Sequence, residues 1–404
     1  MDFDLTDEQQ ATIDVAAKLL GDKATPEAIR AVEQADDLRY DRDLWAAMAD
    51  AGLLGIAVPV EHGGAGLGVL ELALVLEEVG RRTAPVPALA ALALGASPVA
   101  RWGTGAQQAT ILPGVVAGTT VVTAALVEPL GDPLRPSTTA RHEADGWVLD
   151  GARTNVPAGL VADLVIVPAV VAADAAASGD ADIATRDSAG GARSADTGAG
   201  AAEIGLFIVP VDTEGVHRER QGTTTGTPDA RVVLAGVRLG DDALLGPLDA
   251  AGTALRWLVE HAVVASCAVM SGLAAEAVRI TGEYTSTREQ FGRAIATFQA
   301  VGQRAADAYV DAQAIRLTML QAAWRLAAGF PADREVAVAK YFAAVGGQRV
   351  VHAAAHLHGG VGVDRDYPLH RYFLLAKQLE LLLGGATRQL VSLGGILAAE
   401  GAIR

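Results

Sequence analysis

The spacing of apolar residues changes twice along this 404-residue chain, and this change constrains the fold more than any other feature of the sequence. Up to residue 118, apolar residues recur at helical spacing, as in Ile13, Ala17 and Leu20. From residue 119, β-rich runs are separated by Gly, Pro and Asp, and after about residue 244 the helical spacing returns. The sequence therefore predicts an α+β fold with three domains: an α-helical N-terminal domain over 1–118, an antiparallel β domain over 119–243 and a C-terminal helical bundle over 244–404.

Individual elements follow from the same spacing. Thr6 and Gln9 are spaced as a capping box, and Asp43 is predicted to cap a later helix. The expected strands are Val121–Leu126, Trp147–Leu149, Leu164–Val171, Ile204–Val211 and Arg231–Val237. The expected helices of an up-down bundle with an oligomer face are Leu255–Ile280, Phe298–Leu326, Glu335–His356, Pro368–Leu383 and Ala386–Ala399. The insertion 172–202 consists largely of Ala, Gly, Asp and Ser, so we expect a flexible surface loop.

Charge and cysteine content limit the partners and the compartment. A formal net charge of −16 argues against nucleic acid or an anionic membrane, and it requires that any anionic ligand be held by a few local cations. The apolar run Ala262–Ala275 is too short to span a bilayer and is predicted to be a buried helix. No signal peptide is expected, because the first ten residues carry acids where such a peptide is basic. The single cysteine, Cys267, allows no disulfide framework and favours a cytoplasmic location.

Two stretches in the last part of the chain carry a high density of ligand-type groups. Tyr284–Gln299 reads YTSTREQFGRAIATFQ, and His356–Gly362 reads HLHGGVG. These stretches resemble, in the same order, two signatures of the acyl-CoA dehydrogenase family. The segment Gly52–Arg81 also looks like the N-terminal domain of that family, so the resemblance covers nearly the whole chain.

The resemblance implies an FAD-dependent enzyme that desaturates an acyl-CoA thioester between its α and β carbons. It implies that a guanidinium pairs with the pyrophosphate, that aromatic rings and amides hold the rest of the nucleotide, and that a Gly-Gly turn lets the backbone approach the phosphates. An electron-transferring flavoprotein would take up the electrons, and no metal is expected. The residues that match the family's FAD-binding positions are Arg288, Gln290, Phe291, Phe298, Gln299, His356 (where the family usually has Gln), Gly359 and Gly360.

The half of the expected flavin site that holds the isoalloxazine ring departs from the family pattern. Where the family has a Thr-Glu-Pro-Gly-x-Gly-Ser-Asp strand, residues 127–133 read VEPLGDP, so Glu-Pro is kept and both hydroxyls are missing. Where the family has Gly-x-Lys and then Ile-Thr-Asn-Gly, this chain has GAR at 151–153 and VPAG at 156–159. Pro157 has neither the hydroxyl nor the N–H that contacts flavin N5 or O4, which leaves only backbone contacts.

The general base is missing from both positions where the family places it. The reaction requires a carboxylate in an apolar pocket, because desolvation there raises its pKa towards the operating pH. Gly384 stands where most of the family has this Glu, and Ala262 stands at the alternative position. Glu260 and Glu380 are neighbouring acids, and we interpret both as solvated or ion-paired groups. The catalytic residue is therefore unassigned from the sequence.

This pattern resembles the base-lacking subunit of heterotetrameric acyl-CoA dehydrogenases that shorten sterol side chains, above all over His356–Gly394. The first hypothesis is that the chain binds the nucleotide side of FAD while a paralogous subunit supplies the ring side and the base. A second hypothesis is a self-sufficient homo-oligomeric dehydrogenase whose base has moved, for example to Glu260 or Glu380. A third is a flavin-free assembly protein on the same scaffold.

Overall fold

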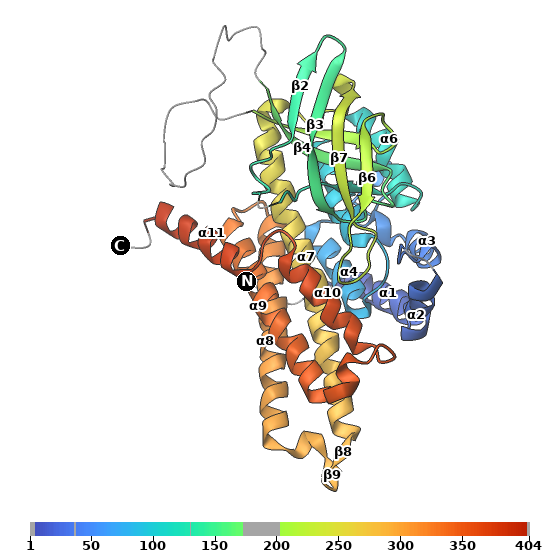
Figure 1. Ribbon diagram of the computed structural model, residues 1–404, viewed down its shortest axis with the longest axis vertical. Helices are drawn as coiled ribbons and strands as arrows, with labels where there is room; N and C mark the ends of the chain where they lie inside the picture. Colours follow the sequence, from blue (N-terminus) through green and yellow to red (C-terminus); the bar gives the residue numbers. More distant parts are fainter. Residues whose placement is uncertain (1–4, 36–37, 130, 173–202, 402–404) are drawn as a thin grey trace.

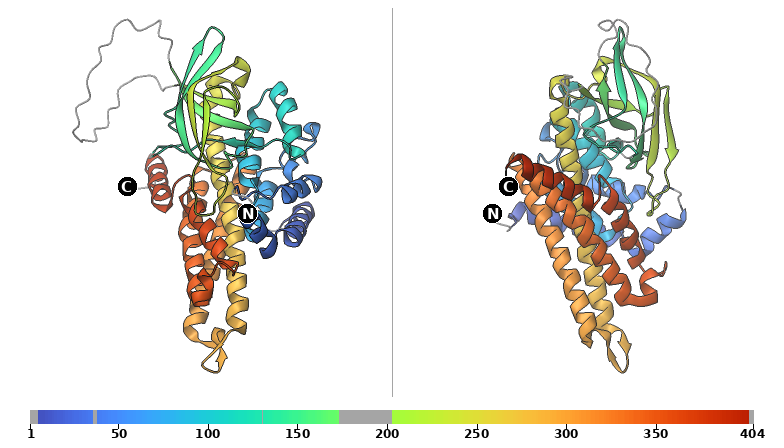
Figure 2. Two further views of the ribbon diagram at one scale, coloured as in Figure 1. Left: turned by 45° about the vertical axis from the view of Figure 1, so that its right-hand side comes forward. Right: turned by 60° about the vertical axis from the view of Figure 1, so that its left-hand side comes forward.

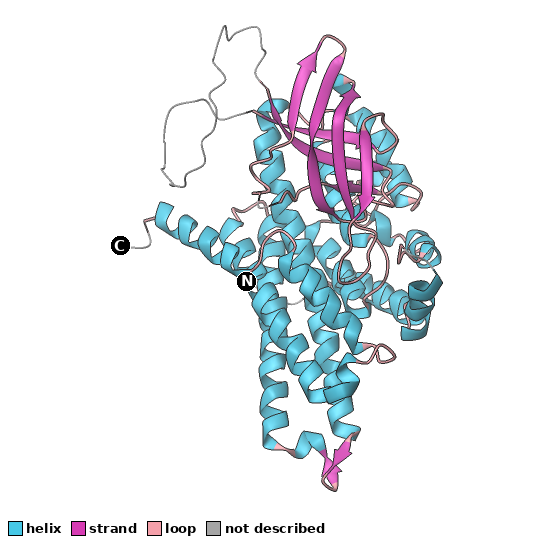
Figure 3. Ribbon diagram, in the orientation of Figure 1, coloured by secondary structure: helices cyan, strands magenta, loops and turns pink. Residues whose placement is uncertain are grey.

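The computed structural model describes residues 5–35, 38–129, 131–172 and 203–401, so the predicted loop over 172–202 lies, except for Ala172, outside them. Helices, a sheet and a second set of helices follow one another as predicted, which confirms the α+β fold class. The sheet occupies one end of the long axis and the C-terminal bundle extends to the other end (Figures 1 and 3). The domain limits at residues 118 and 243 stay predictions.

The N-terminal part is built from short helices. The capping box is confirmed, since the Gln9 N–H donates to the Thr6 hydroxyl at 3.2 Å and the Thr6 N–H donates to the Gln9 side chain at 3.0 Å. The prediction for Asp43 is wrong: Asp41 precedes the helix and accepts from the Leu44 N–H at 2.9 Å, while Asp43 lies inside the first turn. The helices are α1 (Asp7–Lys23), α2 (Pro26–Ala35), α3 (Arg42–Asp50), η1 (Leu53–Gly55), η2 (Val60–His62), α4 (Val69–Arg82), η3 (Leu89–Ala96), α5 (Ser97–Trp102) and α6 (Gly105–Val116).

A seven-stranded sheet forms the middle part. All five predicted strands are present, and the two that the sequence did not predict, β2 and β6, are short, largely polar and mostly exposed. The strands are β1 (Val122–Ala124), β2 (Thr139–Glu143), β3 (Gly146–Val156), β4 (Leu164–Val171), β5 (Ile204–Pro210), β6 (Val216–Arg220) and β7 (Ala230–Leu239). They are arranged in the order β1-β4-β2-β3-β7-β6, and β5 pairs with β4.

The strand pairing is mixed rather than purely antiparallel as predicted. β1 pairs in parallel with the start of β4, and β2 pairs in parallel with its end. The pairs β2·β3, β3·β7, β4·β5 and β6·β7 are antiparallel. Parallel neighbours need a crossover connection. The β2–β3 hairpin lies between β1 and β4 in the chain, and β3 lies between β2 and β4.

A long central helix organises the C-terminal bundle. α7 (Leu248–Thr287) packs against α4 of the N-terminal part and against α8 (Gln299–Ala327), α9 (Asp333–His358) and α10 (Leu369–Leu381). The hairpin strands β8 (Glu289–Gln290) and β9 (Arg293–Ala294) and the turn η5 (Ile295–Thr297) connect α7 to α8, and η6 (Gly359–Val363) follows α9. α11 (Ala386–Ala399) packs against α9 and projects from the side of the bundle (Figure 2). The η4 turn (Asp241–Ala243) joins the sheet to α7.

Two helical segments are long and apolar enough to pass a test for membrane-spanning length and composition. The most apolar window of Leu248–Thr287 is 83% buried inside the fold, so its apolar side chains serve the core. The corresponding window of Leu369–Ala399 is only 11% buried, and the turn Leu382–Gly385 interrupts it between α10 and α11. The exposed apolar residues of α11 include Leu390 and Val391.

Candidate functional site

A β-hairpin with a two-residue turn presents the first group of predicted FAD-binding residues at the outer end of the bundle. α7 ends at Thr287, and β8 and β9 pair through Glu289 and Gln290 (Figure 1, bottom). Phe291 and Gly292 between them have φ values of +56° and +77°, as a type I′ turn requires. A left-handed conformation is strained for a bulky residue, and the Phe291 side chain is 93% exposed. The fold therefore holds an aromatic ring out into solvent in a strained turn.

The Gly-Gly turn lies at the same end of the bundle. The Tyr284 ring stacks on the His358 ring with their centroids 4.3 Å apart, and its hydroxyl donates to the His358 carbonyl at 3.4 Å. Gly359 has a φ of +62°, and a Cβ built on Gly359 or Gly360 would meet no atom within 4 Å. The two sequence signatures are thus joined in space, and the glycine turn leaves an open approach to the backbone.

The predicted FAD-binding side chains form an open surface rather than an enclosed pocket. Phe291 and Phe298 make an edge-to-face contact with centroids 6.1 Å apart, and the Arg293 guanidinium lies 4.2 Å above the Phe298 ring. Phe298 is half-buried, whereas the side chains of Arg288, Gln290, Gln299 and His356 are exposed. Arg293, which the sequence analysis did not select, thereby joins the group.

An apolar cavity lies where the N-terminal helices, the sheet and α10 meet. Its walls come from the end of α4 and the segment after it, from the turn after β3, and from α7 and α10. The apolar lining includes Tyr40, Val79, Pro85, Val86, Leu89, Pro157, Ala158, Val269, Leu375, Leu379 and Leu382. This lining suits a hydrophobic acyl group.

A second, more polar cavity lies next to the first, and the two share Asp229, Gln378 and Leu382. It is lined by Val127 and Asn155 from the expected ring side and by Gly384, where the family's base is expected. Gly384 has a φ of +100°, and a Cβ there would lie 2.4 Å from Cδ of Arg388. The turn therefore selects glycine, and an acid at this position would be strained.

Asp229 is an acid that the sequence analysis missed. Its side chain is 5% exposed on the wall between the two cavities, where it accepts from the Ala158 N–H at 3.2 Å and from the Gln378 amide at 2.9 Å. Burial raises its pKa to about 6, and hydrogen bonds from the Ala158 N–H and the Thr227 side chain oppose the shift. In the sequence Asp229 is a lone acid before a β-rich run, a pattern that exposed turns share. Only the packing of the turn after β3 and of α10 identifies it.

The two acids considered as relocated bases, Glu260 and Glu380, lie in surroundings different from those of Asp229. Glu380 forms an ion pair with Lys377 at 2.6 Å. Burial raises the pKa of Glu260, and Arg256 opposes the shift. Neither residue lines the apolar cavity or the second cavity. Within the described residues, Asp229 is the acid placed on the wall that both cavities share.

The Glu-Pro pair kept from the family's ring-side strand has a partner inside this chain. Glu128 pairs with Arg153 at 2.5 Å, and Arg153, at 0% exposure, also donates to the Pro168 carbonyl. Burial lowers the pKa of Arg153 to about 10, and the Glu128 carboxylate opposes the shift. The Ser137 N–H donates to Glu128 at 2.8 Å. Glu128 therefore balances a buried charge instead of facing a ligand.

The two halves of the expected flavin site differ in how well they fit the cofactor. The outer end offers a guanidinium, amides, aromatic rings and an open glycine turn, which are the groups that bind a pyrophosphate and an adenine. On the ring side, Pro157 has no N–H, and its carbonyl accepts from the Thr123 hydroxyl at 2.8 Å. The residues present fit the nucleotide half and do not fit the ring half. The described residues contain no group of three or more His, Cys, Asp or Glu placed to hold a metal ion.

Comparison with known proteins matches most of the chain to one family. Residues 6–119 match the acyl-CoA dehydrogenase N-terminal domain and residues 253–393 match the C-terminal domain. Acyl-CoA dehydrogenase FadE27 of Mycobacterium tuberculosis (strain ATCC 25618 / H37Rv) is 37% identical over 98% of this chain and 99% of its own. Two solved structures cover 98% of this chain and 99% of theirs: a Tcur3481-Tcur3483 steroid ACAD variant (38% identity, TM-score 0.85) and the ChsE4-ChsE5 complex from Mycobacterium tuberculosis (37% identity, TM-score 0.86). Together with the two signatures at the end of the bundle, these matches show that the chain belongs to the acyl-CoA dehydrogenase family of FAD-dependent oxidoreductases.

Proposed function

We propose that the chain is one subunit of an FAD-dependent acyl-CoA dehydrogenase and contributes the nucleotide side of a flavin site that a paralogous subunit completes. The contrast between the two halves of the site carries this proposal. Phe291 is 93% exposed beside exposed Arg288, whereas Glu128 and Arg153 neutralise each other on the ring side. An exposed guanidinium binds a phosphate weakly in water, so a covering subunit is needed for firm binding.

Exposed apolar side chains support assembly with another chain. Tyr309, Val310 and Leu317 are exposed on α8, and Leu390 and Val391 are exposed on α11. Apolar residues grouped on helix faces are typical of subunit interfaces. The name of the ChsE4-ChsE5 complex supports a hetero-oligomer of related chains, and the steroid named for the Tcur3481-Tcur3483 enzyme supports a steroid-bearing CoA thioester as the substrate class. We further propose an electron-transferring flavoprotein as electron acceptor and the cytoplasm as location.

Co-expression tests the subunit role. The chain purified alone should be colourless, and the chain co-expressed with a paralogous acyl-CoA dehydrogenase should carry flavin. In that complex Arg288→Ala should reduce the flavin bound per chain, while Arg101→Ala, which removes an exposed cation from α5, should not. A chain that binds FAD stoichiometrically and oxidises acyl-CoA by itself would contradict the proposal. Colourless protein in every combination would favour the flavin-free scaffold.

One observation favours the second candidate function, a self-sufficient dehydrogenase. Asp229 meets the physical requirements of a base, because its carboxylate is buried beside an apolar cavity with a pKa near its operating range. In this role Asp229 would take the α proton of the thioester while the Ala158 N–H and the Gln378 amide hold the carboxylate in place. Bound flavin would supply the hydride acceptor.

Kinetic measurements on the chain reconstituted with FAD in the absence of a partner subunit test this second role. If Asp229 is the base, Asp229→Asn should lower kcat by about 100-fold or more while KM changes little. The rate of the unsubstituted chain should rise with pH through about 6, as the carboxyl group ionises. Glu260→Gln serves as the matched control, because it neutralises another half-buried acid that lines neither cavity. Equal rates in all three proteins would exclude Asp229 as the base.

A further inference from the structure

We propose that Tyr40 and Thr83 form a hydrogen-bonding site on the wall of the apolar cavity and select a ligand whose apolar body carries a hydroxyl or carbonyl oxygen. Both residues line this cavity and lie outside the three sequence stretches that carry the family resemblance. Where the ligand is an acyl group, which rests on the proposed function, the pair favours an oxygenated acyl group over a plain hydrocarbon chain. The site itself belongs to this chain and requires no flavin.

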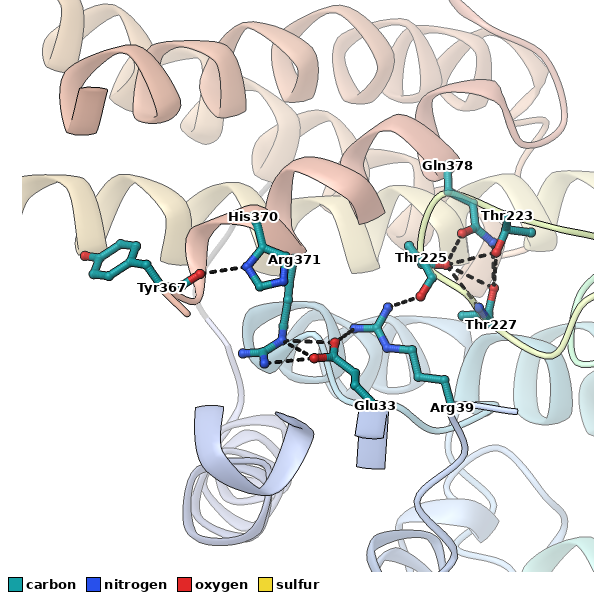
Figure 4. Close-up of polar contacts among 9 residues, drawn as sticks. All are labelled: Glu33, Arg39, Thr223, Thr225, Thr227, Tyr367, His370, Arg371 and Gln378. Atoms are coloured by element: carbon teal, nitrogen blue, oxygen red, sulfur yellow. Dashed lines mark hydrogen bonds and ion pairs between the residues drawn. The ribbon is translucent and has the colours of Figure 1, made fainter. Parts of the chain in front are cut away.

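The two side chains are buried, and their hydroxyl groups have no hydrogen-bond partner. Tyr40 is 8% exposed and Thr83 is 5% exposed. Neither hydroxyl forms a hydrogen bond to any residue that the structure describes. In contrast, the side chains of Thr225, Thr227 and Gln378, which line the same cavity, bond to one another (Figure 4). Because a buried hydroxyl without a partner is unfavourable, an oxygen atom of a ligand would supply the bond that the fold leaves unmade.

Both residues lie on the wall that the N-terminal helical part contributes. Thr83 follows α4, and Tyr40 precedes α3. The Asp41 N–H donates to the Pro85 carbonyl at 2.8 Å, which joins these two segments side by side. The Arg42 guanidinium lies 4.8 Å from the centre of the Tyr40 ring, an attractive contact that favours one orientation of the ring. A ligand in the cavity therefore meets both segments on one wall.

The backbone of Thr83 is strained at this position. Its φ is +48°, in the left-handed region where a β-branched residue is an outlier. Thr83 caps the end of α4, and its N–H donates to the Gly80 carbonyl at 3.1 Å. Glycine is the residue that such a cap favours, because it adopts this conformation without strain. The cap itself needs no side chain, so a strained threonine on a cavity wall points to a role in ligand binding.

The chemistry of the pair defines the ligand. Burial raises the pKa of Tyr40 to about 12, and Arg42 opposes the shift, so the phenol stays protonated at neutral pH and can donate. The Thr83 hydroxyl can donate or accept. A hydroxyl or carbonyl oxygen on the ligand matches these groups. The surrounding lining, which includes Val79 and Val86, requires that the rest of the ligand be apolar.

Equilibrium dialysis of the full chain against 2-naphthol and, separately, 2-methylnaphthalene tests the proposal. The two probes have nearly the same size and differ by a hydroxyl in place of a methyl group, so the ratio of their dissociation constants measures the preference for oxygen. Tyr40→Phe and Thr83→Val each remove one hydroxyl and keep the side-chain shape. Each should shift this ratio away from 2-naphthol roughly fivefold, because one hydrogen bond is lost. Tyr309→Phe, which changes an exposed tyrosine on α8, should leave the ratio unchanged.

Stability of the ligand-free chain is the second measurement. Because neither hydroxyl has a partner among the described residues, Tyr40→Phe and Thr83→Val should leave the midpoint of urea unfolding unchanged or raise it. Thr83→Gly removes the backbone strain, so it should raise the midpoint and shift the binding ratio as Thr83→Val does.

Three outcomes would overturn the proposal. The first is that neither probe binds, and the second is that the ratio is the same in Tyr40→Phe, Thr83→Val and the unsubstituted chain. The third is a lower unfolding midpoint in both hydroxyl variants, which would show that the hydroxyls serve the fold. A failure of the flavin test with Arg288→Ala would count against the proposed function alone, since the dialysis requires neither flavin nor a partner subunit.

Discussion

Two regions carry the two halves of one expected cofactor site: the outer end of the bundle, and the cleft, which is the region of Glu128, Arg153 and Asp229 beside the sheet. Their residues differ in solvent exposure and in the partners they have within the chain. At the outer end, Arg288 and Phe291 are exposed, and Phe291 is held in a strained turn. In the cleft, Glu128, Arg153 and Asp229 are buried or nearly so and bonded to partners within the chain. The difference supports the proposal that another molecule completes the outer end, whereas the chain itself supplies the partners of these buried groups in the cleft.

The two regions contribute differently to the stability of the isolated chain and to ligand binding. A strained, exposed aromatic residue reduces the stability of the isolated chain and brings a benefit only when something covers it. Removal of one partner of a buried ion pair leaves the other charge buried and uncompensated. The main role of these residues is therefore in the stability of the fold. Substitutions should therefore affect ligand binding at the outer end and stability in the cleft.

The largest expected effect is on stability, in the cleft. Arg153→Met leaves the Glu128 carboxylate buried without its partner, and it should lower the free energy of unfolding by about 3–5 kcal/mol. Urea denaturation measures this effect. The exposed pair of Arg238 and Glu143 is the matched control, and Arg238→Ala should cost about 0–1 kcal/mol. Equal losses for the two variants would remove the contrast between the regions.

At the outer end, Arg288→Ala should act on binding and leave stability alone. In the complex with a paralogous subunit, it should weaken flavin binding roughly tenfold or more, because a guanidinium–phosphate contact is lost. Flavin absorbance per chain measures this, and denaturation of the chain alone should show no change. A variant that keeps its flavin but unfolds more easily would reverse the assignment of this region.

Asp229 gives the cleft a pH-dependent stability. Its pKa is about 6 in the fold and near 3.8 when unfolded, so folding favours the protonated form. The stabilising contribution is full below about pH 4 and is lost as the pH rises to about 6, a change of about 3 kcal/mol. Asp229→Asn should remove this dependence. Parallel pH profiles of unfolding for the two proteins would show that the carboxyl group is not desolvated.

The smallest expected effect is a gain in stability at the hairpin tip. Asn tolerates the left-handed conformation of residue 291, so Phe291→Asn should stabilise the isolated chain by about 1 kcal/mol. The same change should weaken flavin binding in the complex, because the aromatic contact is removed. Thermal unfolding and flavin content measure the two effects. A loss of stability in the isolated chain would mean that the Phe291 ring already has a packing role there.

Local pattern was enough to predict most elements. The capping box at Thr6 involves residues three apart, and the bundle helices have a repeat that is visible within a few turns. The short polar strands β2 and β6 were missed because their mostly exposed residues carry no clear alternation. The Asp43 prediction failed because Asp41 and Asp43 are equally plausible caps until the first helical residue is known. The parallel pairing of β4 depends on chain connectivity, which strand propensity does not encode.

The sequence by itself determined the order of helices and strands and the presence of two family signatures, because periodicity and motif spacing are properties of neighbouring residues. Tertiary structure alone decided which charged groups are buried together. Glu33, Arg39 and Arg371 meet from distant parts of the chain, and Asp229 becomes a desolvated acid only where it packs against Ala158 and Gln378. Desolvation and charge pairing depend on contacts between remote segments, and a linear sequence does not specify those contacts.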